Sequence, residues 1–297
     1  MNDERIYKLL KLMVDLLAMI PRKILNFFSD LLGLVWYMLD KRHRNVVLEN
    51  INLAYPKKFS KSDAKKFTRK NLKFIAGFIF EIIWSYSKKQ DELYKYFSIK
   101  GLANIENAIK KRKGVILLTG HMGNFELFIP AFAKAGIEPY VLYRKFDFKP
   151  LERLMCKMRQ RFGVTLMPLR GASKKIDEIL KNGGIVGTML DQNVDWYKGV
   201  FVNFFGKPAC TNNGLAKIVL RSKPAVVPLC IIKKNNNYIV EFFPEIPLKI
   251  SGDPIKDIEN NTQNYASAIE AMVRLSPEQY FWVHNRWKTK PYCILKD

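Results

Sequence analysis

The sequence predicts an α/β fold in which a mostly parallel central sheet is flanked by helices, preceded by an N-terminal membrane-contacting helical segment. Two features of the 297-residue chain indicate this fold. Between residues 102 and 190, short apolar runs alternate with amphipathic stretches, which is typical of parallel strands joined by crossover helices. Residues 1–40 are apolar along most of their length, but no part reaches the ~20 uninterrupted apolar residues of a spanning helix.

The N-terminal segment is the first of two predicted parts: residues 1–40 as hydrophobic membrane-anchor helices and residues 41–297 as the main domain. Helices are expected on both sides of Pro21, which interrupts a helix interior. Trp36 and Tyr37, with basic residues directly after them, are typical of a helix lying at head-group level. Two helices packed on the core are the alternative.

The remaining elements are predicted in chain order from periodicity and turn residues. Residues 45–56 are expected to form a connector and residues 62–87 a long helix. Further helices are expected at 102–113, 124–136, 151–161, 172–181, 212–222 and 263–275. Strands are expected at 115–118, 138–143, 164–169, 185–190, 225–232 and 238–243, the last as an antiparallel addition at the sheet edge. The aromatic-rich segment 191–211 is expected to be a loop that lines an apolar channel or closes the core.

The composition indicates an anionic partner, because 50 basic and 27 acidic residues give a net charge of +23. Phospholipid, phosphorylated glycolipid, nucleic acid and an acidic protein all satisfy this charge. The four cysteines are scattered, which favours free thiols over a disulfide framework. No metal-binding spacing of histidine, cysteine or acidic residues is present in the sequence, so no metal site is expected.

The candidate catalytic residues lie in residues 114–127, reading GVILLTGHMGNFEL. His121 follows a predicted buried strand, and ligands of open α/β sheets bind at the carboxyl ends of strands. If the loop curls back, Glu126 hydrogen-bonds one imidazole nitrogen and leaves the other as a proton acceptor. Backbone N–H groups of Gly123 and Asn124 are candidates to hold a developing oxyanion. A histidine with a purely structural role is the alternative that spacing alone leaves open.

The string GHMGNFEL closely resembles the signature of the bacterial lipid A biosynthesis secondary (late) acyltransferase family, within the lysophospholipid acyltransferase superfamily. His121 and Glu126 occupy the two places of that family's H-x-x-x-x-D/E pattern. FFGKPACT and the closing PEQYFWVHNRWK are also similar to family segments. The resemblance implies a glycerolipid-acyltransferase-like fold and the catalytic pair His121 and Glu126.

The resemblance also implies substrate-binding residues between the first motif and a later Asp-Gln pair. Arginine suits phosphate and carboxylate groups because its planar fork donates two parallel hydrogen bonds. The candidates are Gly123, Asn124, Arg144, Arg159 or Arg161, Arg170, Asp191 and Gln192. An ordinary solvated basic face is the alternative for each arginine.

The expected activity is transfer of a fatty acyl chain from an acyl thioester to a hydroxyl of a lipid A precursor, in lipopolysaccharide biosynthesis. The resemblance implies acyl carrier protein as the acyl donor. The other expected partners are an anionic glycolipid or phospholipid and the membrane, with no nucleic acid and no cofactor. The expected location is the cytoplasmic face of the inner membrane, held peripherally or monotopically. Two alternatives remain: an acyltransferase for another glycolipid or lysophospholipid, and a non-enzymatic basic protein on membrane or nucleic acid.

Overall fold

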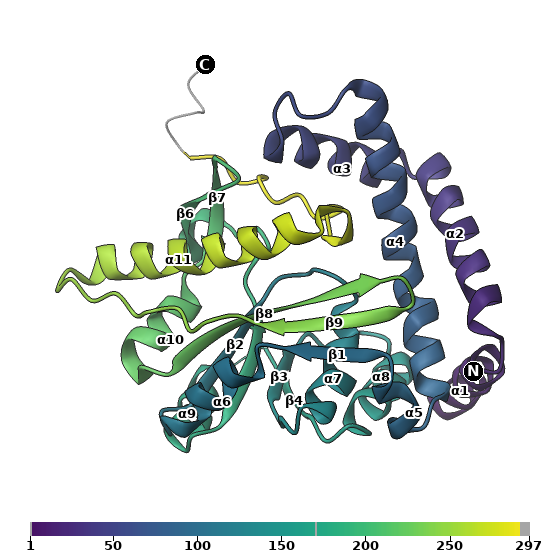
Figure 1. Ribbon diagram of the computed structural model, residues 1–297, viewed down its shortest axis with the longest axis horizontal. Helices are drawn as coiled ribbons and strands as arrows, with labels where there is room; N and C mark the ends of the chain where they lie inside the picture. The colour runs from purple at the N-terminus through teal and green to yellow at the C-terminus, as the bar shows by residue number, and fades with distance from the viewer. Residues whose placement is uncertain (1, 170, 292–297) are drawn as a thin grey trace.

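The computed structural model describes residues 2–169 and 171–291 and contains a seven-stranded sheet with helices on both faces (Figure 1). The strand order is β1-β9-β8-β2-β5-β3-β4, and every neighbouring pair is parallel except β8 and β9. The strands are β1 (Phe97–Lys100), β2 (Val115–Thr119), β3 (Tyr140–Tyr143), β4 (Thr165–Pro168), β5 (Ile185–Met189), β8 (Ala225–Lys234) and β9 (Asn237–Phe242). The predicted mixed α/β fold with a mostly parallel sheet is confirmed.

Helices make up most of the remaining described chain. They are α1 (Asp3–Ala18), α2 (Arg22–Leu39), α3 (Lys41–Ala54), α4 (Lys61–Ser87), α5 (Gln90–Tyr94), α6 (Leu102–Lys110), α7 (Phe128–Lys134), α8 (Lys149–Gln160), α9 (Ser173–Lys181), α10 (Gly214–Ser222) and α11 (Pro254–Leu275). Three 3-10 turns, η1 (Phe125–Leu127), η2 (Trp196–Lys198) and η3 (Pro277–Gln279), lie in the connections.

Strand β2 shows how the sheet is buried on both faces. All five of its residues are buried, as expected for a central parallel strand. Because side chains alternate along a strand, Ile116 and Leu118 join the cluster that includes helices α9, α10 and α11. Val115 and Leu117 join the opposite cluster, which includes helices α6 and α7.

Helices α1 and α2 lie beside the long helix α4, with the break between them at Pro21 as predicted (Figure 1). Close approach of α2 to α4 requires a glycine, because a Cβ on Gly33 would lie 2.4 Å from the Lys73 Cα. Large apolar residues of both helices are exposed, including Leu12, Leu16 and Phe27. Within residues 2–169 and 171–291, no helix is long and apolar enough to cross a membrane. The two-part division and the membrane contact stay predictions.

Several segments differ from the prediction. Residues 45–56 are not a connector but lie mostly in helix α3, which Asp40 caps by accepting the His43 backbone N–H. Its buried face repeats at helical spacing through Val47, Ile51 and Ala54, a pattern interrupted by the polar residue Asn50. This buried asparagine satisfies carbonyls of a distant segment, so it masks the helical period in the sequence.

The second difference is in the aromatic-rich segment 191–211, which was expected to be a loop. It contains an antiparallel hairpin, β6 (Gly199–Phe204) and β7 (Lys207–Asn212), with a turn at Phe205 and Gly206 that both adopt positive φ. Strand β9 does pair antiparallel with β8, but it is not at the edge, because the unpredicted strand β1 pairs with it.

Candidate active site

Sheet register brings together two residues that are 70 positions apart. Strands β2 and β5 are parallel neighbours, and their last residues, Thr119 and Met189, are paired. His121 follows the first strand and Asp191 the second by the same offset of two residues, so both reach the carboxyl edge of the sheet together. Gly120 permits this approach, since a Cβ there would lie 3.2 Å from the Asp191 Cγ.

Asp191 binds His121 with both carboxylate oxygens. Oδ2 accepts the His121 backbone N–H at 2.9 Å, and Oδ1 lies 2.7 Å from Nδ1. The His121 side chain is 19% exposed and the Asp191 side chain 3% exposed. Because Nδ1 carries the hydrogen-bonded proton, Nε2 is the free base of the neutral ring. This is a histidine held in one tautomer by a carboxylate, the arrangement that general-base catalysis uses.

The same contact changes the acidity of both groups. Burial alone would lower the pKa of His121, but the charge and hydrogen bond of Asp191 outweigh it and raise the pKa above the ordinary value of 6.5. Burial alone would raise the pKa of Asp191, yet His121 lowers it to about 2. Asp191 is therefore ionised at neutral pH, as an orienting carboxylate must be.

The expected hydrogen bond between Glu126 and His121 is not formed. Glu126 instead accepts two bonds from Arg159, at 2.9 Å from Nε and 2.5 Å from Nη2. The two side chains are 17% and 10% exposed, so each neutralises the other in a largely dry environment. The expectation failed because the loop after His121 does not curl back. Glu126 lies in turn η1, whereas Asp191 already holds the imidazole.

His121, Glu126 and Arg159 nonetheless line one cavity of about 230 Å³. Its other walls are mostly apolar: Leu117, Phe125, Phe128, Ile129, Phe132, Val141, Leu142, Met189 and Leu229. Gly187 also lines it, and a Cβ there would meet only the Tyr140 carbonyl oxygen, at 3.9 Å. Such a cavity favours a hydrocarbon chain, because each buried methylene contributes about 0.8 kcal/mol.

The aromatic-rich segment 191–211 does not form this channel. None of its aromatic residues lines the His121 cavity. Phe204 and Phe205 are buried and contact Tyr280 and Trp282, respectively, so they close the core. The apolar walls come instead from the η1–α7 segment and the central strands, whose apolar residues the sequence pattern assigned only to the core.

Gly123 and Asn124 hold the loop in shape. Gly123 has a φ of 60°, and a Cβ would lie 1.9 Å from the Ile231 carbonyl oxygen. Its N–H donates to the Gln279 carbonyl at 2.9 Å and so is not available to an oxyanion. The Asn124 side chain is fully buried and donates to Glu81 at 3.0 Å. The expected oxyanion contact of the Gly123 N–H is therefore corrected to a positioning contact, whereas the substrate contact of the Asn124 backbone N–H stays a prediction.

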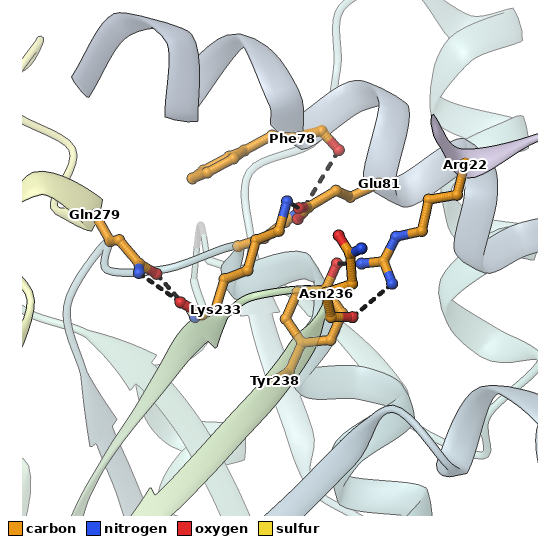
Figure 2. Close-up of polar contacts among 8 residues, drawn as sticks. Arg22, Phe78, Glu81, Lys233, Asn236, Tyr238 and Gln279 are labelled. Atoms are coloured by element: carbon orange, nitrogen blue, oxygen red, sulfur yellow. Dashed lines mark hydrogen bonds and ion pairs between the residues drawn. The ribbon is translucent and has the colours of Figure 1, made fainter. Parts of the chain in front are cut away.

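Figure 2 shows the buried polar cluster behind this loop. Glu81 of α4 pairs with Lys233 of β8 at 2.6 Å, and the backbone N–H and carbonyl of Lys233 both bond to the Gln279 side chain at 2.8 Å. Nearby, Arg22 donates to the Tyr238 hydroxyl at 2.8 Å. The sequence did carry a signal for this cluster, since Glu81 is the one acid within the apolar run 74–86.

The remaining predicted residues divide between the site and the scaffold. Arg144 lines the cavity and is exposed at its mouth, and the Gln192 side-chain nitrogen lies 3.4 Å from His121 Nε2. Arg161 does not line the cavity, because its guanidinium donates to the Tyr86 and Lys88 carbonyls at the end of α4. Of the pair left open by the sequence, Arg159 is thus the site residue. Arg170 lies outside the described residues.

The closing motif packs against the catalytic loop. The Phe281 N–H donates to the His121 carbonyl at 2.9 Å, and buried Asn71 donates to the Tyr280 carbonyl at 2.7 Å. Arg286 is buried and bonds to Cys210 and Thr211 of β7. His284 accepts the Asn193 backbone N–H at Nε2, so it supports the segment after Asp191. In the part of the chain that the structure describes, no group of three His, Cys, Asp or Glu residues is placed to hold a metal ion.

The parallel α/β sheet thus presents a carboxylate-bound histidine beside an apolar cavity, an arrangement suited to general-base chemistry on a substrate with a hydrocarbon chain. The family described as bacterial lipid A biosynthesis acyltransferase matches residues 5–289. The chain belongs to this family, which confirms the resemblance seen in the sequence, and it is an acyltransferase.

Individual relatives agree with this assignment. The lipid A biosynthesis palmitoleoyltransferase of Escherichia coli K12 is 24% identical over 275 residues, covering 92% of this chain and 87% of the relative. The lauroyltransferase of lipid A biosynthesis from the same organism is 23% identical over 278 residues, covering 93% and 89%. The phosphatidylinositol mannoside acyltransferase of Mycobacterium tuberculosis H37Rv is 22% identical over 193 residues, covering 64% and 59%.

Proposed function

We propose that this protein transfers a fatty acyl chain from an acyl thioester to a hydroxyl group of a lipid A precursor. The observation that carries the proposal is the His121 imidazole, which Asp191 orients at the wall of an apolar cavity. Similarity to two lipid A acyltransferases over more than nine-tenths of the chain supports the acceptor class.

In the proposed mechanism, His121 Nε2 removes the proton of the acceptor hydroxyl as that oxygen attacks the thioester carbonyl. The C–S bond then breaks, and the imidazolium returns the proton to the leaving thiolate. Asp191 stabilises the imidazolium in between, because its carboxylate stays ionised beside the ring. General-base assistance of this kind contributes about 10² to 10⁴ in rate.

Glu126 acts in this mechanism through Arg159 and not through His121. The ion pair closes the polar side of the cavity and keeps the guanidinium of Arg159 in place. The acyl chain of the donor lies among the aromatic and aliphatic walls. In this proposal Arg144, which is exposed and lines the cavity, binds a phosphate of the donor's pantetheine arm.

The proposed donor is acyl carrier protein, an acidic partner that the net charge of +23 favours. The proposed location is the cytoplasmic face of the inner membrane, bound peripherally or monotopically. Exposed apolar residues along both N-terminal helices support it, among them Leu9, Leu12, Leu16, Phe27, Leu31 and Leu39. Aliphatic faces of this kind insert into the acyl boundary of a bilayer.

The test is acyl transfer by the purified protein from acyl carrier protein thioesters to a lipid A precursor, with the product identified by mass spectrometry. We expect His121→Ala to abolish transfer, while Lys113→Ala, an exposed change away from the cavity, retains it. Full turnover in His121→Ala would exclude the mechanism. Absence of product with wild-type protein and every lipid A precursor would exclude the acceptor.

A second acceptor class has one specific observation in its favour. The similarity to the phosphatidylinositol mannoside acyltransferase extends over 193 residues. A lipid profile of cells lacking the protein distinguishes the two acceptors. Underacylated lipid A supports the main proposal, whereas an unchanged lipid A with altered phosphoglycolipid supports the alternative.

A further inference from the structure

A second, polar cavity of about 570 Å³ lies beside the active site. Its walls come from the start of α3, from the segment after Asp191 and from the closing motif. Gln192, whose side chain touches His121, is followed directly by Asn193, which lines this cavity. His284 also lines this cavity and lies close enough to His121 for the two rings to interact electrostatically, so a ligand held here lies near the His121 imidazole, outside the apolar cavity already described.

Positive charge dominates this polar cavity. Its lining includes Arg42, Lys198 and Lys288 but only one carboxylate, Asp195, which lies 3.5 Å from Lys198. Arg42 and Lys288 are exposed, and within residues 2–169 and 171–291 neither has a carboxylate partner within ion-pair distance. Two unpaired cations facing a roomy polar cavity are suited to an anion with several oxygens, such as a phosphate monoester.

Hydrogen bonds hold the Asn193 segment that lines this cavity in place. Asn193 donates to the Thr289 hydroxyl at 3.0 Å and accepts the Thr289 N–H at 3.1 Å. Its backbone N–H donates to His284 Nε2 at 2.9 Å, which requires a neutral ring with its proton on Nδ1. These contacts fix the segment that joins the cavity to His121.

The surroundings indicate that the anion belongs to a lipid. Leu39, next to the start of α3, is 76% exposed, and Trp196 and Tyr197, next to Lys198, are 55% and 63% exposed. Exposed aromatic and aliphatic residues around a cationic site are typical of the head-group level of a membrane. Val194 lines both this cavity and an apolar one of about 340 Å³, so polar and apolar sites adjoin.

We propose that the cavity formed by Arg42, Lys198 and Lys288 binds the phosphate-bearing head group of the lipid acceptor. The proposal rests on the proposed function and adds where the acceptor is held. The phosphate lies against Arg42 and Lys288, and the acceptor hydroxyl reaches His121 past Gln192. Hydrocarbon of the acceptor extends into the adjoining apolar cavity beyond Val194.

The test compares the double variant Arg42→Ala/Lys288→Ala with wild-type protein on phosphorylated and dephosphorylated forms of the same acceptor. We expect the KM for the phosphorylated acceptor to rise about 10-fold or more, because two charge-assisted contacts are lost. The kcat and the KM for the dephosphorylated acceptor should stay unchanged. Arg42→Lys/Lys288→Arg, which keeps both charges, should recover most of the loss.

The matched control is Arg69→Ala/Lys113→Ala, which removes the same charge from exposed positions that do not line the cavity. Equal KM changes for both acceptor forms, or an equal loss in this control, would overturn the site. Inhibition by inorganic phosphate at the concentration at which the phosphorylated acceptor saturates would show a site for free anion and would also overturn it.

A binding measurement separates this site from the transferase assignment. Flotation with phosphatidylcholine vesicles, with and without phosphatidate, requires no acyl transfer. We expect wild-type protein and the Arg69/Lys113 control to gain affinity from phosphatidate, and the Arg42/Lys288 variant to lose most of that gain. An undiminished gain in that variant contradicts the site even if acyl transfer itself is never detected.

Discussion

His121 and Asp191 are bonded twice, through the backbone N–H at 2.9 Å and through the ring Nδ1 at 2.7 Å. The first bond fixes the loop and the second fixes the tautomer. Because the carboxylate is almost fully buried, water screens its charge on the ring less than it would at the surface. We therefore expect the reactivity of His121 to depend on Asp191.

The first prediction concerns Asp191→Asn. An amide keeps the shape but loses the charge that stabilises the imidazolium and selects the Nδ1–H tautomer. We expect kcat to fall about 10²- to 10⁴-fold with little change in the KM for the donor, measured by transfer from acyl carrier protein. Asp91→Asn, an exposed change on α5, is the matched control and should retain full activity. Retention of more than half the activity by Asp191→Asn would contradict the role of this carboxylate.

The second prediction concerns pH. His121 must be neutral to act as a base, and its pKa in the folded protein is raised. The rate of acyl transfer should therefore increase with pH, with the midpoint of the increase above 6.5. Protonated His121 is stabilised by Asp191. The contact between protonated His121 and Asp191 therefore stabilises the fold fully below the pKa that His121 has in the unfolded chain. This stabilisation is lost as pH rises through the raised pKa that His121 has in the folded protein. In Asp191→Asn the midpoint should move to lower pH, and a midpoint that does not move would show that another group titrates.

The third prediction separates Glu126 from the histidine. Among the described residues, the Glu126 carboxylate bonds only to Arg159, so Glu126→Gln should lower kcat while leaving the pH midpoint of the rate unchanged. Arg159→Gln should do the same, and the double variant should be no worse than either, because both act as one pair. Glu106→Gln, exposed on α6, is the control. A pH midpoint lowered by Glu126→Gln would restore the direct pairing that the motif spacing suggested.

The fourth prediction concerns acyl-chain length. Gly187 lines the apolar cavity, and a Cβ there meets almost nothing, so Gly187→Val should enter the cavity without distorting the strand. We expect kcat/KM for the longest accepted thioester to fall about 10-fold or more relative to a shorter one, at about 0.8 kcal/mol per displaced methylene. Phe132→Leu, which enlarges the same cavity, should shift the preference toward longer chains. Equal losses of kcat/KM for thioesters of every length would mean that the acyl chain binds outside this cavity.

The fifth prediction concerns the buried cluster of Figure 2. Glu81→Gln leaves the Lys233 ammonium without its counter-charge, and the Glu81 side chain is only 6% exposed. We expect the free energy of unfolding to fall by about 3 kcal/mol, measured by urea denaturation. Lys233→Met combined with Glu81→Gln should recover part of that loss, since no charge is then left unpaired. Additive losses in the double variant would contradict the coupling.

The local features of the site followed from short-range patterns in the sequence. The apolar run before Gly120 forms β2, and His121 follows it at the carboxyl edge, because strand periodicity and turn residues act over a few neighbours. The alternation of strands and helices between residues 102 and 190 appeared as predicted, with ends shifted by a few residues, whereas helix α11 begins nine residues before its predicted start. Membership of the acyltransferase family was also readable from the motifs.

The partners of those residues depended on the tertiary structure. Asp191 reaches His121 only because β5 lies next to β2 in register, and nothing within five positions of His121 encodes that neighbour. Glu126 forms an ion pair with Arg159, and the Asn124 side chain donates a hydrogen bond to Glu81. Both partners are distant in the sequence. A motif specifies which chemical groups are present near a strand end. Strand order and packing decide which of them touch, because hydrogen bonds depend on distances of about 3 Å that sequence separation does not record.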